Sequence, residues 1–254
     1  MSGYRDPFES PKARLKRANA HIARLHKRIE VFFKKAPYRT VVELDADGVT
    51  QLHKFKFTKR LSESCVHSAT EALEALRFAL DQIGYATAVA SGAVLPKRTQ
   101  FPIGDDEAGL ANLIKRNVSK DLPKEILALF VSFKPYKGGN DAIWALNKLR
   151  NAGHTTLLPV AVVSDGATGF SGTLSNASIP GNLTLDPEKN EIIFGRVGPG
   201  GIFNYDIRFS FMIRLSEIDV VAYNQAVAVL RAMSAEVKRI LMATEAECRR
   251  LGLL

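Results

Sequence analysis

Apolar residues spaced by three and four positions predict a long helix near the amino end of the chain. Ser10 and Pro11 are the residue types that favour a helix N-cap and a first helical position, and the pattern continues to about Lys35. The apolar side chains share one stripe, formed by Leu15, Ala18, Ile22, Leu25, Ile29 and Phe32. Such a stripe predicts packing against another helix.

Two alternating segments follow and predict a β-hairpin. Residues 38–44 and 49–57 flank the sequence Asp45-Ala46-Asp47-Gly48, in which the Asp-Gly pair suits a tight turn. The other ligands of a calcium-binding loop are missing from this segment. The two aspartates therefore predict turn chemistry and not a metal site.

Helical spacing returns at Leu61 and continues on one stripe to Ile83. A loop with several glycine and proline residues is expected over 91–105. Further helices are expected at about 106–118, 123–133, 141–151 and 217–251. We expect the two terminal helices to pack together or against the second long helix.

Segments punctuated by Gly, Asn and Pro predict a small antiparallel sheet before the last helix. Five short strands are expected, at 157–163, 170–174, 182–185, 191–197 and 205–215. The glycine-rich run from Gly195 to Gly201 is followed by no Gly-Lys-Ser or Gly-Lys-Thr, which favours a turn over a phosphate-binding loop.

These patterns predict an α+β fold. We expect a helical core of long antiparallel helices, an N-terminal β-hairpin and a small antiparallel sheet before the C-terminal helix. A single domain over residues 1–254 is expected, built from a basic helix and hairpin (1–60), a helical core (61–154), and the sheet with the last helix (155–254).

Composition narrows the class of protein. The 46% hydrophobic and 24% charged content is typical of a folded globular chain. No apolar run approaches the roughly 18 residues that a membrane span needs, and the start has no secretory signal, so we expect a cytoplasmic protein without a membrane partner. Two cysteines far apart and five histidines without metal-ligand spacing predict no metal and no cofactor.

The net charge of +9 is concentrated near the amino end. Residues 1–60 contain fifteen Lys or Arg and six Asp or Glu, whereas the remainder contains twenty of each. A basic stripe lies beside the apolar stripe of the first helix, and its arginines are the candidate nucleic-acid-binding residues Arg14, Arg17, Arg24 and Arg28. The alternative is a solvated face, because no aromatic residue interleaves these arginines as a single-strand platform requires.

Two helical segments carry candidate chemistry. Arg77 and Asp81 are four residues apart on one helix face and can pair. If that helix faces the end of the 141–151 helix, one pocket would hold the candidate catalytic residues Arg77, Asp81, Asn151 and His154, with His154 as an acid or base near neutral pH. The alternative is structural: a helix-surface ion pair, a helix end and an ordinary histidine.

The same segments resemble a broad group of bacterial proteins of unknown function. The shared features are a Leu-Arg-x-Ala-Leu-Asp helix within 73–82, the Gln-Phe-Pro-Ile turn at 100–103 and an Asn-x-x-His helix end within 143–155, and the resemblance covers about residues 60–165. It implies a bacterial source. The chain departs from the group at Glu74 and Gln82, where the group has histidines, and at Thr155, where it has arginine.

The helical pattern is also distantly similar to the HEPN class, helical RNA-cleaving or nucleotide-binding proteins marked by an arginine and a histidine with four to six residues between them. Gln82 stands where the histidine after Arg77 would be needed, and only three residues separate Arg150 from His154. This resemblance implies a degenerate motif.

Two functions follow from the sequence. The first is a binding or interaction protein whose basic helix contacts nucleic acid or an acidic protein. The alternative is a HEPN-like RNA-acting hydrolase, in which heptad-like terminal helices offer a surface for a homodimer. Whether the protein is an enzyme is left open by these patterns.

Overall fold

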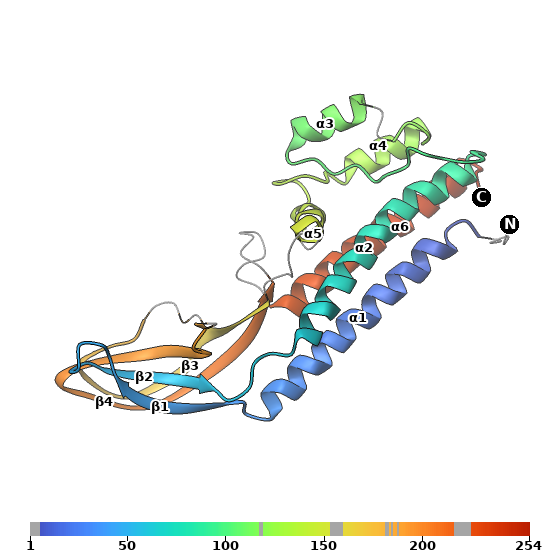
Figure 1. Cartoon of the computed structure of the whole chain (residues 1–254). Helices are drawn as coiled ribbons and strands as arrows, with labels where there is room; N and C mark the ends of the chain where they lie inside the picture. The colour runs from blue at the N-terminus through green and yellow to red at the C-terminus, as the bar shows by residue number, and fades with distance from the viewer. Residues whose placement is uncertain are drawn as a thin grey trace. The chain divides into compact units, whose positions relative to one another are not determined.

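The computed structural model describes residues 6–116, 119–152, 160–180, 183, 185–186, 188–215 and 225–254 (Figure 1). The chain divides into two compact units, and each is described by itself. The first comprises residues 1–26, 66–158 and 216–254, and the second comprises 27–65 and 159–215. This grouping does not test how many domains fold independently, so the expectation of a single domain stays a prediction.

Three long helices make up most of the first unit: α1 (Glu9–Lys34), α2 (Glu63–Ala90) and α6 (Ala226–Arg250). Residues 27–34 of α1 and 63–65 of α2 belong to the second unit. They lie side by side (Figure 1), with α1 antiparallel to both partners. The hydroxyl of Ser10 donates to Gln82 at 3.1 Å, and the hydroxyl of Ser234 donates to Asn19 at 2.7 Å. The predicted packing of the terminal helices is confirmed.

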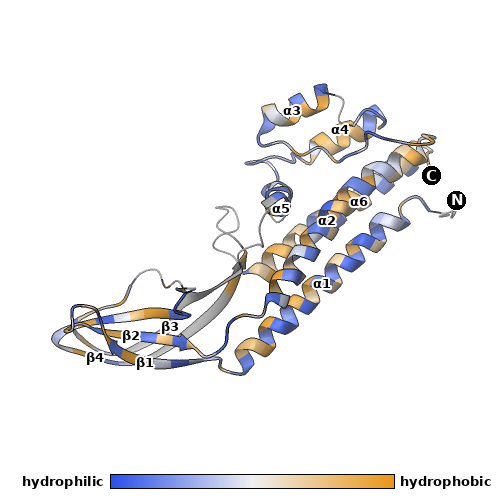
Figure 2. Ribbon diagram, viewed as in Figure 1, coloured by the Kyte–Doolittle hydropathy of each residue, from blue (hydrophilic) through white to orange (hydrophobic). Residues whose placement is uncertain are grey.

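Apolar side chains of the long helices meet in a shared core. Hydrophobic and hydrophilic residues alternate along each helix (Figure 2), so that one side of each is buried. The fully buried members include Leu25, Leu73, Leu76, Leu80, Ile83, Leu230, Val237 and Ile240. The spacing of three and four that predicted the helices is thus the spacing of their contacts.

Three shorter helices complete the first unit, namely α3 (Glu107–Lys115), α4 (Lys124–Ser132) and α5 (Asp141–Ala152). All three were predicted. Side-chain caps begin two of them: Asp106 accepts from the backbone N–H of Gly109 at 2.7 Å, and Asn140 accepts from that of Ile143 at 3.1 Å. None of the described helices is long and apolar enough to span a bilayer.

The second unit contains one four-stranded antiparallel sheet, ordered β1-β2-β4-β3. Its strands are β1 (Tyr38–Leu44), β2 (Gln51–Phe57), β3 (Val160–Ser178) and β4 (Glu191–Leu215). The hairpin is confirmed: Asp47 accepts from the N–H groups of Val49 and Thr50, and Gly48 has a φ of 71°. The aspartates therefore serve the turn.

Two long strands replace the short strands expected after residue 154. The glycine-rich run is no turn, since it lies within β4. Ser175 pairs with Ile202 and Ala177 with Val197, so residues 198–201 form a bulge, and Asn176 donates to the carbonyl of Pro199 at 3.1 Å. Glycine tolerates the backbone of a bulge while the ladder resumes beyond it. The strand expected at 182–185 lies partly outside the described residues.

Gly84, in α2, lies against the loop that follows that helix. A Cβ atom at this position would lie 1.9 Å from the carbonyl oxygen of Thr99. We predict that Gly84→Ala lowers the free energy of unfolding by about 1–3 kcal/mol, because the backbone of the loop must move. Urea denaturation followed by circular dichroism measures this change.

Gly109→Ala is the matched control, because its nearest contact is the side-chain oxygen of Asp106 at 3.2 Å, which can rotate. Alanine is favoured over glycine inside a helix by about 1 kcal/mol. An unchanged unfolding midpoint for Gly84→Ala would contradict the close approach.

Candidate functional site

The guanidinium of Arg77 joins α2, α5 and the loop between α2 and α3. Its Nε donates to the side-chain oxygen of Asn147 at 3.2 Å, and Nη2 donates to the carbonyl of Phe101 at 3.3 Å. Its Nη1 lies 2.9 Å from Asp81 Oδ1 in an ion pair. Only 11% of the Arg77 side chain is exposed. Nε and Nη2 are therefore hydrogen-bonded, whereas among the described residues Nη1 has the ion pair with Asp81 but no hydrogen bond.

Asp81 holds the loop as well as the arginine. Its Oδ1 accepts from the backbone N–H of Phe101 at 3.2 Å, so Phe101 is bound from both its N–H and its carbonyl. Burial raises the pKa of Asp81, and the Arg77 charge opposes this rise. Burial likewise lowers the pKa of Arg77, opposed by Asp81. Arg77 and Asp81 thus form a partly desolvated ion pair that holds the loop after α2 in place at Phe101.

Part of the predicted catalytic set is brought together. Arg77 and Asp81 meet, but Asn151 accepts instead from Arg150 Nη1 at 3.2 Å, and the amide that reaches Arg77 is Asn147, one turn earlier in α5. His154 lies outside the described residues. The catalytic role of the set stays a prediction, while the geometry around Arg77 favours a role in holding three segments together.

An exposed aromatic ring lies beside this cluster. Phe78, the neighbour of Arg77 in α2, is 41% exposed. The guanidinium carbon of Arg14 in α1 lies 5.8 Å from its ring centroid, and that of Arg150 in α5 also lies 5.8 Å away. An aromatic residue therefore accompanies the basic stripe after all, supplied by another helix. The sequence of α1 alone could not indicate this aromatic neighbour, because Phe78 belongs to α2.

His21 occupies the middle of the basic stripe and is buried. Its Nδ1 lies 2.6 Å from the carboxylate of Glu71, a residue of α2. Arg24 Nη2 lies 2.8 Å from the same ring nitrogen, and Arg17 Nε donates to Nε2 at 3.5 Å. Burial lowers the pKa of His21, which the Glu71 charge opposes. Arg28 belongs to the second unit and donates to the carbonyl of Ser64 at 2.6 Å.

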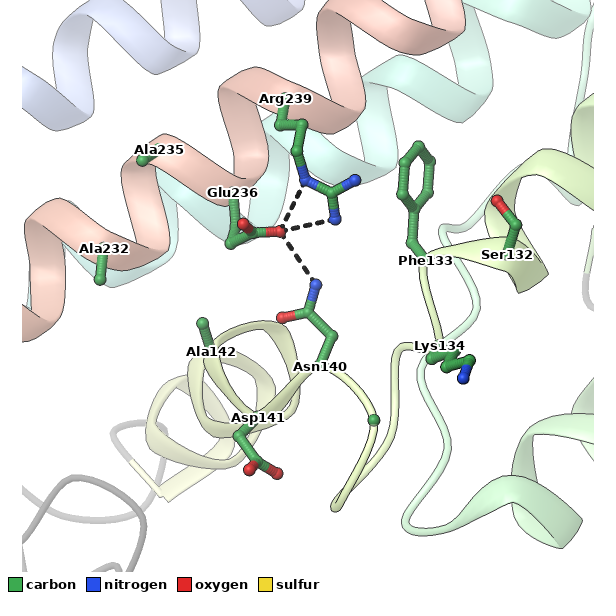
Figure 3. A pocket seen from close by; sticks show the side chains of 11 residues that line it. Ser132, Phe133, Lys134, Asn140, Asp141, Ala142, Ala232, Ala235, Glu236 and Arg239 are labelled. Atoms are coloured by element: carbon green, nitrogen blue, oxygen red, sulfur yellow. Dashed lines mark hydrogen bonds and ion pairs between the residues drawn. The ribbon is translucent and has the colours of Figure 1, made fainter.

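A pocket of about 620 Å³ lies in the first unit between α6 and the residues that join α4 to α5 (Figure 3). Glu236 accepts from Asn140 at 3.0 Å and from two nitrogens of Arg239 at 3.1 and 2.8 Å. The Arg239 guanidinium also lies 4.8 Å from the Phe133 ring centroid. This pocket could not be predicted from the sequence, because its two walls are at least 90 residues apart in the chain.

The charges that line this pocket balance. Lys134 and Arg239 are opposed by Asp141 and Glu236. The Glu236 carboxylate is held by its hydrogen bonds, and the pKa of this group is lowered by Arg239 and Asn140 although burial opposes the shift. The pocket therefore has no excess charge that would select an anion, unlike the Arg14–Arg150 region.

Comparison with protein families, curated proteins and solved structures gives no match for this chain. The fold and site define a mixed α+β protein with a basic helical face. The resemblance to a bacterial group and the HEPN-like character stay predictions. In the part of the chain that the structure describes, no group of three or more His, Cys, Asp or Glu side chains could hold a metal ion.

We predict that Arg77→Ala lowers the free energy of unfolding by about 3 kcal/mol, because it leaves Asp81, Asn147 and the Phe101 carbonyl without their donor. The value lies at the low end for a buried pair since 31% of the Asp81 side chain remains exposed. Urea denaturation measures the loss.

Arg249→Ala is the control for this change. Arg249 and Glu245 form an ion pair across the same four-residue interval, but the arginine is exposed, so a loss below about 1 kcal/mol is expected. Equal losses of unfolding free energy for the two variants would show that Arg77 does not hold the three segments together.

Stability should also depend on the protonation of His21. Because its pKa is lower in the folded chain than in the unfolded chain, stability is expected to fall as the pH drops below the unfolded-state pKa of about 6.5. The slope is at most about 1.4 kcal/mol per pH unit. Urea denaturation at about pH 7.5 and about pH 5.5 measures the fall.

His21→Gln should make this fall smaller. A remainder is expected from His53 in the sheet, whose pKa burial also lowers. The same pH dependence in the variant as in the original chain would exclude His21 as a contributor.

Proposed function

We propose that this protein binds nucleic acid through a basic face of its first unit, made of Arg14, Arg17, Arg24 and Arg150. One observation carries the proposal: among the described residues, none of these four arginines forms an ion pair with a carboxylate. Three of the four arginines of α6 differ, since Arg239, Arg249 and Arg250 are each paired with a glutamate. Unpaired guanidinium groups on one side of the unit supply a positive surface.

The chemistry of this face fits phosphate groups. A guanidinium presents a planar fork of N–H donors that matches phosphate oxygens and keeps its charge at any physiological pH. From Arg14 to Arg24 the helix rises by about 15 Å, which is several phosphate spacings along a strand. The face therefore suits an extended polyanion better than a single small anion.

Glu71 is an acidic residue beside this surface, and it lies against His21. Its carboxylate contacts the His21 ring at Nδ1, where Arg24 also approaches, so part of its charge is directed to the buried ring. The arginines on either side remain available for phosphates. The alternative of an RNA-acting hydrolase depends on His154, which lies outside the described residues, and stays a prediction.

A cytoplasmic location fits nucleic-acid binding, since RNA and bacterial DNA are both present there. An acidic protein is the other partner expected from the charge. It would compete for the same arginines, and it would be favoured if neither RNA nor DNA binds.

We predict that the triple variant Arg14→Gln, Arg17→Gln, Arg24→Gln binds nucleic acid more weakly and with less dependence on salt. Three lost phosphate contacts should reduce the slope of log K against log salt concentration by about 2 on a single strand. Fluorescence anisotropy with labelled RNA and DNA between about 50 and 200 mM salt measures the slope. A gel of the same samples shows whether the nucleic acid stays intact.

The triple variant Arg239→Gln, Arg249→Gln, Arg250→Gln is the matched control, because it removes the same charge from α6. Its affinity and slope should stay close to those of the original chain. An equal effect of both triple variants would mean that net charge, and not the proposed face, governs binding.

A further inference from the structure

Phe78 is one of three exposed large apolar side chains of α2, together with Tyr85 and Val89. Leu76 and Leu80, two positions away on either side, are fully buried, whereas 41% of Phe78 is exposed. A single exposed phenylalanine is common on protein surfaces and indicates little by itself. What distinguishes Phe78 is that cations from two other helices lie next to its ring.

Both cations are held loosely. Arg14 and Arg150 each lie 5.8 Å from the ring centroid, close to the outer limit of about 6 Å for a cation–π interaction. At an exposed site such an interaction contributes about 0.5–1 kcal/mol. A charge-assisted hydrogen bond to a phosphate is stronger. Either guanidinium can therefore move from the ring to a phosphate at small cost.

Arg150 also has an unused donor. Its Nη1 donates to Asn151, but its Nε is buried and has no hydrogen-bond partner in the part of the chain that the structure describes. A buried donor without an acceptor costs about 1–3 kcal/mol. An oxygen of a bound phosphate would relieve this cost once the Arg150 side chain turns away from Phe78 and exposes its Nε. Arg77, by contrast, is engaged by Asp81, Asn147 and Phe101, and it fixes the turn of α2 that carries Phe78.

We propose that the basic face is selective for single strands, with one base stacked on Phe78 and the adjacent phosphates bound by Arg14 and Arg150. This inference rests on the proposed nucleic-acid binding. In a duplex the faces of the bases are covered by their neighbours, so the ring of Phe78 could not reach them, whereas an unpaired base can stack on an aromatic side chain. Selectivity comes from stacking, and affinity for the backbone comes from the arginines.

The test compares a labelled single strand of about 16 nucleotides, as RNA and as DNA, with a hairpin duplex of the same length. Anisotropy is measured for the original chain, Phe78→Ala, Phe78→Leu and Phe78→Tyr. Base stacking on an aromatic ring contributes about 1–3 kcal/mol, so Phe78→Ala and Phe78→Leu should weaken single-strand binding roughly 5- to 150-fold. Their duplex binding should be unchanged, and Phe78→Tyr should retain single-strand binding.

Tyr85→Ala is the matched control, since Tyr85 is an aromatic residue of the same helix with 47% exposure. It should bind both probes like the original chain. Thermal unfolding of each variant verifies that it is folded.

The two proposals fail in different ways. If Phe78→Ala binds single strands as well as the original chain while the arginine triple variant does not, stacking is refuted and nucleic-acid binding stands. If the original chain prefers the duplex, selectivity for single strands is refuted. If the original chain binds neither probe, the proposed function is refuted and this inference with it.

Discussion

The packing of the first unit depends on one charged side chain, Arg77, which is largely removed from water. A desolvated guanidinium is costly unless it finds an opposite charge and hydrogen-bond acceptors. Arg77 has a carboxylate as its ion-pair partner, and an amide and a backbone carbonyl accept its hydrogen bonds, so three segments contribute. The requirement is directional, so it determines where each segment lies. Arg77 thereby determines the positions of three segments: the turn of α2 that carries it, the loop between α2 and α3 at Phe101, and the middle of α5.

The arginines of α1 and those of α6 differ in whether a glutamate pairs with them. Three of the four arginines of α6 are paired with glutamates three or four residues away, which a helix can arrange within its own sequence. The arginines of α1 have no such glutamates at those spacings, apart from the carboxylate that α2 directs to His21. The positive surface is therefore not a result of net charge alone. It arises because the acidic residues of the chain are placed elsewhere.

The helices could be predicted from the sequence, and the long strands could not. Helical spacing is a local property, and Leu73, Leu76 and Leu80 are buried as their positions require. A glycine-rich run is ambiguous, since it can form a turn or a bulge, and the outcome depends on the partner strand. Residues 198–201 remain in β4 because β3 continues to pair on both sides of them.

The same distinction applies to the candidate site. The Arg77–Asp81 pair could be predicted because its members are one turn apart on one helix. The approach of Arg14 and Arg150 to Phe78 could not, since these residues are separated by more than 60 positions and their apolar neighbours only indicate that helices pack, not which side chains meet. The contact of Asn147 with Arg77 was partly indicated by the sequence, because Asn147 shares the polar side of α5 with Asn151.

The residues that hold the helices in place lie next to the residues that are proposed to bind nucleic acid, but the two sets are different. Arg77 and Phe78 are neighbours in sequence and point to different surroundings: one to buried acceptors, the other to solvent and two cations. Asn147 and Arg150 stand in the same relation on α5, because the first holds Arg77 and the second lies beside Phe78, with an Nε that has no partner among the described residues. A change at Arg77 would therefore displace Phe78 and Arg150 together. Loss of binding in such a variant would indicate a displaced surface and would not identify Arg77 as a contact of the nucleic acid.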